Sequence, residues 1–268
     1  MHNLRVSIVQ GETRWHDPAG NRDYYGELIA PLHGTTDLVV LPETFTSGFS
    51  NDAIADAETM DGPTVAWMRE QAAILDAAVT GGVQVRTEEG VFNRMLFATP
   101  AGGLVHYDKR HLFSFAREHE RYAGGQDRVI VEWKGWNILL QVCYDLRFPV
   151  FSRNRFDVAR AGLPDYDLAL YVANWPSARS YAWKTLLRAR AIENLCYVAG
   201  VNRVGTDGNG LHYDGDSAVI DFLGHPLSEA TDQEVVSTML LQAAPLVEHR
   251  ARFPALLDGD AFEFGNDA

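Results

Sequence analysis

The cysteine at position 143 has both the chemical type and the sequence context of a nucleophile. Cys143 ends the apolar run WNILLQVC and is followed at once by YDLRFP, so a strand stops there and a helix can begin near Pro149. A strand-to-helix turn holds a side chain at the sheet edge, where backbone N–H groups favour thiolate and oxyanion charge. A buried cysteine acting as a small apolar side chain is the alternative. The position alone allows both interpretations.

Two further ionisable residues follow predicted strands. Glu43 in LPETF comes after the apolar run DLVVL, where an α/β sheet presents ligand-facing side chains. Partial burial there would raise the pKa of its carboxyl toward that of a general base, and a carboxylate that caps the next turn fits equally well. Lys109 in YDKRH predicts either a solvated lysine or an ammonium that neutralises an oxyanion and lowers the pKa of a nearby thiol.

Eleven apolar runs predict the strands that position these residues. They cover residues 4–10, 37–41, 77–86, 91–99, 104–107, 129–133, 136–143, 167–172, 196–204, 217–222 and 234–241. Helices are predicted between them, over residues 22–32, 63–75, 149–160 and 178–194. Because helices alternate with strands early and hairpins dominate later, the pattern indicates a mixed α/β fold rather than a doubly wound parallel sheet.

The apolar runs are spread evenly along the chain, without a Ser/Gly-rich linker, low-complexity segment or internal repeat. We therefore expect a single domain over residues 1–241. The strand pattern stops after Leu241. Residues 242–268 are expected to form a C-terminal helix or tail that packs loosely or lies at a subunit interface.

Composition and charge exclude several classes of protein. With 23 Lys and Arg against 36 Asp and Glu, the net charge of −13 repels phosphate backbones and anionic lipid, so neither nucleic acid nor membrane is an expected partner. Apolar runs fall short of the roughly 18 residues of a membrane span, and the start MHNLRVSIVQ does not resemble a secretory signal. Cys143 and Cys196 lack the spacing of a disulfide framework or a metal site, which favours the cytoplasm.

Other catalytic arrangements have weaker support. His111 and His119 could pair with a cysteine, but neither lies in a papain-type or caspase-type context. An HExxH motif is absent, because Ala123 stands where the second histidine would be. The glycines at 205, 208 and 210 lack a Walker lysine and indicate a turn. We therefore predict no metal site and no phosphate-binding loop.

Three separated segments together resemble a known family. LPETFTSGF, YDKRHLF and VCYDLRFP, in this order, are similar to the motifs of the nitrilase (carbon–nitrogen hydrolase) superfamily, whose members use a Glu-Lys-Cys triad. The resemblance continues through REHERYAGG, RARAIENLCYVAGVNRVG and YDGDSAVIDFLG, up to about Leu241. It implies a four-layer α-β-β-α sandwich of two mixed β-sheets with helices outside.

The resemblance assigns Glu43 as the general base, Lys109 as the oxyanion-stabilising lysine and Cys143 as the nucleophile. It also implies a further glutamate shortly before a glycine that closes the loop. Glu118 fits that place better than Glu120, which lies two residues later.

The implied chemistry is amide hydrolysis through a thioester. Cys143 would attack the amide carbon while Glu43 takes its proton, and the backbone N–H of Tyr144 would help Lys109 to hold the oxyanion. Ammonia would leave, and water activated by Glu43 would then release the acid. No metal or organic cofactor is required.

The segments CYDLRFP and NWP resemble the Nit-type omega-amidase branch, which hydrolyses the terminal amide of 2-oxoglutaramate and 2-oxosuccinamate. This resemblance implies that Arg147 binds the substrate carboxylate, for which a guanidinium has the right geometry. An Asp145–Arg147 structural pair is the alternative. Trp175 is expected either to wall the pocket or to pack in the core.

The triad by itself does not select one enzyme. A nitrilase, an aliphatic amidase or an N-carbamoyl hydrolase would share it, and a non-catalytic interaction protein could keep the fold. Retention of all three residue types argues against that last class. We expect a small amide as substrate and a homodimer or higher homo-oligomer, because relatives commonly pair through their helical faces.

Overall fold

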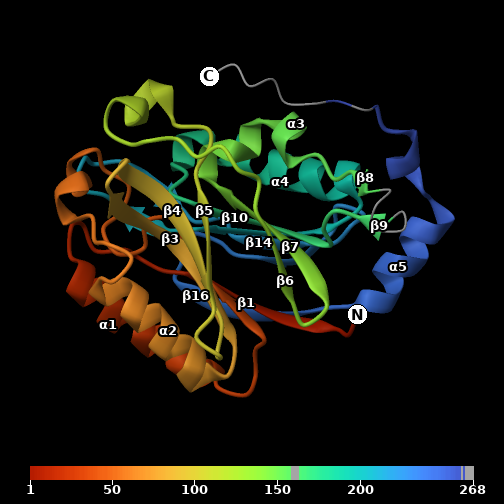
Figure 1. Cartoon of the computed structure of the whole chain (residues 1–268), viewed down its shortest axis with the longest axis horizontal. Helices are drawn as coiled ribbons and strands as arrows, with labels where there is room; N and C mark the ends of the chain where they lie inside the picture. Colours follow the sequence, from red (N-terminus) through yellow and green to blue (C-terminus); the bar gives the residue numbers. More distant parts are fainter. Residues whose placement is uncertain (158–162, 261, 263–268) are drawn as a thin grey trace.

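Two six-stranded β-sheets lie face to face in the computed structural model, which describes residues 1–157, 163–260 and 262 (Figure 1). The first sheet has the order β16-β1-β2-β3-β4-β5. Its central strands β1, β2 and β3 are parallel, whereas β16, β4 and β5 pair antiparallel with their neighbours. Its strands are β1 (Leu4–Gln10), β2 (Leu38–Val40), β3 (Ala78–Thr87), β4 (Gly90–Ala98), β5 (Leu104–Asp108) and β16 (Val235–Leu241).

The second sheet has the order β15-β14-β11-β10-β7-β6 and is mixed in the same way. Strands β7, β10 and β11 are parallel, and β6, β14 and β15 are antiparallel to their neighbours. Its strands are β6 (Ile130–Trp133), β7 (Trp136–Val142), β10 (Leu168–Ala173), β11 (Tyr197–Asn202), β14 (Ala218–Ile220) and β15 (Pro226–Glu229). Two small pairs join β8 (Phe156–Asp157) to β9 (Leu163–Pro164) and β12 (Val204–Thr206) to β13 (His212–Asp214).

Alternating apolar side chains hold the sheets together. In β1, Val6 and Ile8 belong to the core between the sheets, whereas Val9 packs on the opposite face. In β10, Leu170 belongs to the same central core, whereas Tyr171 packs on the outer face. Because successive strand residues point to opposite faces, strands that are apolar at every position bury both faces. The first sheet and the second sheet therefore share one core and each keeps an outer face for helices.

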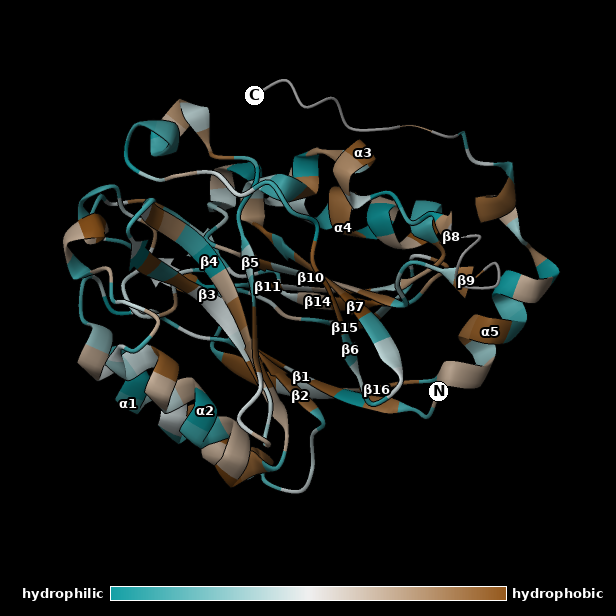
Figure 2. Ribbon diagram, viewed as in Figure 1, coloured by the Kyte–Doolittle hydropathy of each residue, from teal (hydrophilic) through white to brown (hydrophobic). Residues whose placement is uncertain are grey.

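Helices cover these outer faces. Helices α1 (Pro18–Ile29) and α2 (Pro63–Leu75) pack on the first sheet, and α4 (Ser180–Asn194) packs on the second (Figures 1 and 2). The short helix α3 (Pro149–Ser152) follows the cysteine turn and places Phe151 in the core between the sheets. Helix α5 (Ala243–Arg252) follows β16. The α-β-β-α order that the family resemblance implies is confirmed. Within the described ranges, no helix is long and apolar enough to cross a membrane. Short 3₁₀ helices occupy Ala30–Leu32, Asp52–Asp56, Ser114–Ala116, Glu118–Glu120, Cys143–Arg147, Ser177–Arg179 and Ala255–Asp258.

The predicted helix over residues 149–160 is wrong in length. Helix α3 ends at Ser152, and the chain is extended again in β8. The side chain of Asn154 explains the stop, because its Nδ2 donates to the carbonyls of Tyr166 (2.9 Å) and Asn194 (3.0 Å) and ties the chain to other segments. The last part of that prediction, residues 158–160, lies outside the described residues. The predicted strand over 196–204 is also interrupted, between β11 and β12, at Arg203.

Candidate active site

The predicted site residues come from the ends of strands in both sheets. Glu43 follows β2 and Lys109 follows β5 in the first sheet, whereas Cys143 follows β7 in the second. Lys109 Nζ lies 3.0 Å from Glu43 Oε1, and Cys143 and Lys109 line the same cavity. The packing of one sheet on the other thus brings together side chains that are far apart in sequence.

Lys109 is buried between two carboxylates. Its Nζ lies 3.0 Å from Glu43 Oε1 and 3.1 and 3.0 Å from the two oxygens of Glu118, and all three side chains are at most 1% exposed. Burial alone would lower the pKa of the Lys109 ammonium, but the negative charges of Glu118 and Glu43 outweigh it and raise that pKa well above its usual value. Lys109 is therefore a permanent cation, and two of its three protons suffice for the two carboxylates.

Asn93 fixes both carboxylates relative to each other. It lies on β4, and its Nδ2 donates to Glu43 Oε1 at 2.7 Å and to Glu118 Oε1 at 3.0 Å. The sequence analysis missed this residue. A signal was present, because Asn93 is a buried polar residue in a largely apolar strand, and buried amides of this kind almost always have specific partners.

Asn174 connects Glu43 to the cysteine. Its backbone N–H donates to Glu43 Oε2 at 2.7 Å, and its Nδ2 donates to the Glu43 carbonyl at 2.6 Å and to Thr44 Oγ1 at 2.9 Å. Its own carbonyl oxygen lies 3.9 Å from Cys143 Sγ. Asn174 follows β10, so the second sheet clamps a carboxylate that the first sheet carries. The NWP segment contains this residue, although its role could not be inferred from the motif.

The loop after β5 delivers Glu118 and not Glu120. Glu118 Oε2 accepts a 2.6 Å hydrogen bond from the backbone N–H of Phe113, whereas Glu120 is exposed and pairs with Arg117. The loop returns to the lysine at Gly125, whose N–H donates to the Lys109 carbonyl at 3.0 Å. A Cβ at Gly125 would lie 2.2 Å from the carbonyl oxygen of Asp108, so only glycine fits this close approach.

Cys143 lies at a strained point of the backbone. It is the first residue of the 3₁₀ turn Cys143–Arg147 and has φ = +47°, a left-handed conformation that is uncommon for residues other than glycine. The turn resembles the nucleophile elbow of other hydrolases in ending a strand abruptly and exposing the side chain. The predicted presentation of Cys143 at the sheet edge matches this geometry.

The environment keeps the Cys143 thiol protonated. Burial raises its pKa well above the usual value, the charge of Glu43 raises it further, and the opposing effect of Lys109 is smaller. Lys109 does act to lower the thiol pKa, as expected, but its effect is outweighed and the net shift is upward. The physical reason is that Lys109 comes with two carboxylates, so the cluster of Lys109, Glu43 and Glu118 carries a net negative charge beside the sulfur.

Asp145 does not pair with Arg147. Its buried carboxylate accepts hydrogen bonds from Tyr107 Oη (2.7 Å), from the backbone N–H of Val142 (3.0 Å), and from the backbone N–H of His111 (3.0 Å), whose ring Nδ1 lies 2.7 Å away. The alternative of an Asp145–Arg147 structural pair is thus wrong. Asp145 instead ties the cysteine turn to the segment that carries Lys109.

The cavity above Cys143 is aromatic and basic. It encloses about 500 Å³ of space when the open mouth is included. In the part of the chain that the structure describes, no acidic side chain lines it. The lining residues are Phe49, Lys109, Phe113, Ala116, Cys143, Tyr144, Arg147, Asn174, Trp175, Pro176, Arg179, Leu211 and Tyr213.

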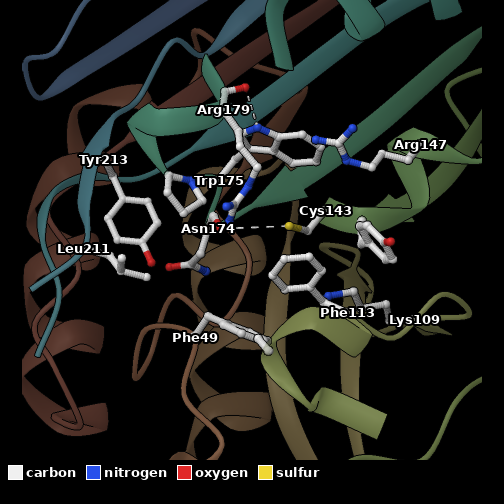
Figure 3. Close-up of a pocket in the computed structure, with 13 residues that line it drawn as sticks. Phe49, Lys109, Phe113, Cys143, Arg147, Asn174, Trp175, Arg179, Leu211 and Tyr213 are labelled. Carbon is white, nitrogen blue, oxygen red and sulfur yellow. Dashed lines mark hydrogen bonds between the residues drawn. The ribbon is translucent and has the colours of Figure 1, made fainter. Parts of the chain in front are cut away.

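Two arginines extend into the space around Trp175 and Cys143 (Figure 3). The Arg147 guanidinium lies over the Trp175 ring, 4.9 Å from its centre, and the Arg179 guanidinium lies over the Phe113 ring at 5.4 Å. Trp175 is buried and donates its Nε1 proton to the Arg179 carbonyl at 2.9 Å, so it both walls the cavity and belongs to the core. Sequence reasoning missed Arg179, although it stands only three residues after the NWP segment.

The sequence and the fold resemble several known proteins. The family model described as Carbon-nitrogen hydrolase matches residues 5–250. Omega-amidase YafV of Escherichia coli (strain K12) is 48% identical over 98% of this chain and 99% of that protein. 2-oxoglutaramate amidase of Bacillus subtilis (strain 168) is 29% identical over 94% of this chain and 96% of that protein. The fold matches a crystal structure of a CN-hydrolase superfamily protein from Xanthomonas campestris, which has an arsenic adduct in its active site. The TM-score is 0.98, the sequences are 72% identical, and the match covers 99% of this chain and 100% of that one.

Proposed function

This chain belongs to the carbon-nitrogen hydrolase family as an amide-hydrolysing enzyme, and we propose that it acts as an omega-amidase on the monoamide of a 2-oxo dicarboxylic acid, such as 2-oxoglutaramate. The observation that carries this proposal is the charge of the cavity. Arg147 and Arg179, neither of which pairs with a carboxylate among the described residues, line it without an acidic side chain among its described lining residues, in a chain whose net charge is −13. A cationic site of this kind selects a substrate with a carboxylate.

We propose that Cys143 attacks the amide carbon while Glu43 takes the thiol proton. Because the thiol pKa is raised, the proton must leave during the attack, and this requires a base nearby. Transfer to Glu43 exchanges one negative charge for another beside Lys109, so no additional buried charge is created. Asn93 and Asn174, which bind the two oxygens of Glu43, hold the carboxylate in position.

The oxyanion of the tetrahedral intermediate has two proposed donors. Lys109 uses two protons on Glu43 and Glu118 and has a third for the cavity that it lines. The backbone N–H of Tyr144, at the start of the turn after the nucleophile, is the second donor. Glu118 keeps Lys109 in place and takes no part in proton transfer in this proposal.

Collapse of this intermediate breaks the carbon–nitrogen bond. Glu43 returns its proton to the leaving nitrogen, ammonia departs, and Cys143 is left as a thioester. Glu43 then takes a proton from water and the hydroxide adds to the thioester carbon. The carbon–sulfur bond breaks, Glu43 returns its proton to the Cys143 sulfur, and the acid is released from the regenerated thiol. Arg147 is the proposed partner of the distal carboxylate, because its guanidinium lines the cavity.

We also propose that the chain forms a homodimer or higher homo-oligomer in the cytoplasm. Large apolar side chains on the outer helices support the oligomer, since Val150 on α3 and Tyr181 and Ile192 on α4 are 56%, 82% and 52% exposed. The two free cysteines support a reducing compartment.

A substrate panel tests the proposed reaction. Ammonia release is measured with 2-oxoglutaramate, with the uncharged amide butyramide, and with butyronitrile and an N-carbamoyl amino acid as substrates of the alternative activities. We expect the largest kcat/KM for 2-oxoglutaramate. A larger kcat/KM for butyramide or for either alternative substrate would overturn the proposal.

The variant Cys143→Ala identifies the nucleophile in the same assay. We expect it to fold and to lose at least about 1,000-fold in kcat, because no other group can form the thioester. Cys196→Ala is the matched control, because Cys196 is buried on the outer face of the second sheet and belongs to a different cluster from the cavity. Near-normal turnover by Cys143→Ala would contradict the mechanism.

A further inference from the structure

The guanidinium of Arg179 is a second cation at the cavity that the proposed reaction leaves unused. It belongs to the 3₁₀ turn Ser177–Arg179 at the start of α4, whereas Arg147 belongs to the turn after Cys143. Neither guanidinium forms an ion pair or a hydrogen bond with any residue that the structure describes; each is held over an aromatic ring. Arginine side chains held in this way keep their donors free for a ligand.

The cavity has two unpaired guanidiniums, whereas one substrate carboxylate requires only one. A single guanidinium already binds a carboxylate with two parallel hydrogen bonds. Arg147 is exposed, whereas Arg179 is partly buried, so Arg179 is the less solvated of two cations that line the same cavity. A substrate with its amide carbon at Cys143 and its carboxylate at Arg147 would leave the atoms between them for Arg179 to bind.

We infer that Arg179 recognises the 2-oxo group of the substrate and excludes a 2-ammonium group at the same position. This inference rests on the proposed function, because it takes the distal carboxylate to be bound by Arg147. The 2-oxo oxygen is a hydrogen-bond acceptor next to the carboxylate, and a planar guanidinium can donate to both groups at once.

The same charge discriminates against amino-acid amides. Glutamine has the chain length and carboxylate of 2-oxoglutaramate but carries an ammonium at carbon 2. That ammonium would meet the like charge of Arg179 in a partly desolvated cavity, where repulsion is stronger than in water. It would also find no carboxylate partner, because Glu43 and Glu118 are already bonded to Lys109 and no acidic residue is among the described residues that line the cavity. Arg179 would thereby protect glutamine from hydrolysis.

The test compares three amides that differ only at carbon 2: 2-oxoglutaramate, the 2-unsubstituted glutaramate, and glutamine. The variant Arg179→Gln removes the charge and keeps a polar side chain of moderate length. We expect about a ten- to hundredfold loss of kcat/KM on 2-oxoglutaramate, mainly in KM, and no more than a few-fold loss on glutaramate. The preference for 2-oxoglutaramate over glutamine should fall by at least about tenfold.

Arg188→Gln is the matched control, because it removes the same charge from α4, where Arg188 pairs with Glu229 away from the cavity. Thermal unfolding and circular dichroism verify that the variants fold, and binding of glutaramate and 2-oxoglutaramate to Cys143→Ala, with and without Arg179→Gln, gives the preference independently of turnover. Equal losses on 2-oxoglutaramate and glutaramate, or an unchanged preference over glutamine, would overturn the inference. Failure of the proposed function is a separate result, seen in the unmodified enzyme as a preference for butyramide.

Discussion

At the residue scale, the proposed mechanism requires the Glu43 carboxylate both to transfer protons and to stay fixed by hydrogen bonds. Glu43 must accept a proton from sulfur, yet its Oε1 accepts hydrogen bonds from Lys109 (3.0 Å) and Asn93 (2.7 Å), and its Oε2 accepts one from Asn174 (2.7 Å). In the proposed step, the proton moves from Cys143 to Glu43, so a thiolate replaces the carboxylate beside Lys109 and the total charge of the cluster does not change.

The variant Glu43→Gln tests both tasks. We expect a loss in kcat of at least about 100-fold, because glutamine keeps the shape of the side chain but cannot take or return a proton. Rapid-quench measurement of ammonia, with mass spectrometry of the acyl-enzyme, should show slow acylation and slow thioester hydrolysis together. Glu120→Gln is the control, since Glu120 is on the surface. A fast burst of ammonia followed by a stalled acyl-enzyme would restrict Glu43 to the second step.

Titration of the Cys143 thiol tests the electrostatics directly. Its raised pKa implies that ultraviolet thiolate absorbance appears only at a higher pH than for a free cysteine, and that the enzyme rests as the thiol at neutral pH. Because the negative charge of Glu43 contributes to this rise, Glu43→Gln should move the thiolate transition to lower pH. Subtraction of the Cys143→Ala spectrum removes any signal of Cys196. A transition that moves upward in Glu43→Gln would contradict the assigned cause.

At the element scale, the turn after β7 depends on the buried carboxylate of Asp145, which is not among the described residues that line the cavity. Asp145 receives donors from β5, from the segment after it, and from the last residue of β7, so it sets the position of Cys143 relative to Lys109. His111 stacks on Phe148, with ring centres 3.8 Å apart, and strengthens the same contact. The element that presents the nucleophile is thus built from two sheets.

Asp145→Asn should therefore damage the turn and not the substrate preference. An amide nitrogen would face the N–H donors of Val142 or His111, and an unsatisfied buried donor costs about 1–3 kcal/mol. We expect a lower thermal midpoint and parallel losses of kcat/KM on 2-oxoglutaramate and on butyramide. Arg147→Ala should differ, with a selective loss of about ten- to hundredfold on the charged amide. A selective loss in Asp145→Asn would reverse these two assignments.

The sequence predicted the helices and strands whose bounds are set by local residues, and it did not predict features that depend on distant contacts. The apolar run of β1 and the Pro63 start of α2 are local features, and the structure has both elements at the predicted bounds. The predicted length of helix α3 was wrong because the helix is ended by hydrogen bonds of Asn154, and these go to residues 12 and 40 positions away. The alternative of an Asp145–Arg147 pair was wrong for the same reason, since the partners of Asp145 include Tyr107, 38 positions away.

At the scale of the whole molecule, the motifs predicted which residues assemble but not their balance of charge. The order of LPETF, YDKRH and VCYD was enough to place Glu43, Lys109 and Cys143 in one site. The raised thiol pKa depends on the burial of Cys143 and on how close Glu43 and Glu118 lie to it, and the motifs give neither quantity. Arg179 was missed because a sequence does not show that its guanidinium forms no ion pair with the residues that the structure describes.

The split of the site between two sheets makes this chain suited to complementation. A break in the loop between Gly125 and β6 would leave Glu43 and Lys109 on one fragment and Cys143 on the other. The second fragment also carries β16, which pairs with β1 of the first over its whole length, from Leu4 opposite Leu241 to Gln10 opposite Val235. Reassembly would therefore be guided by strand pairing and reported by ammonia, so that one hydrolase becomes a two-part sensor for the proximity of whatever proteins the fragments are fused to.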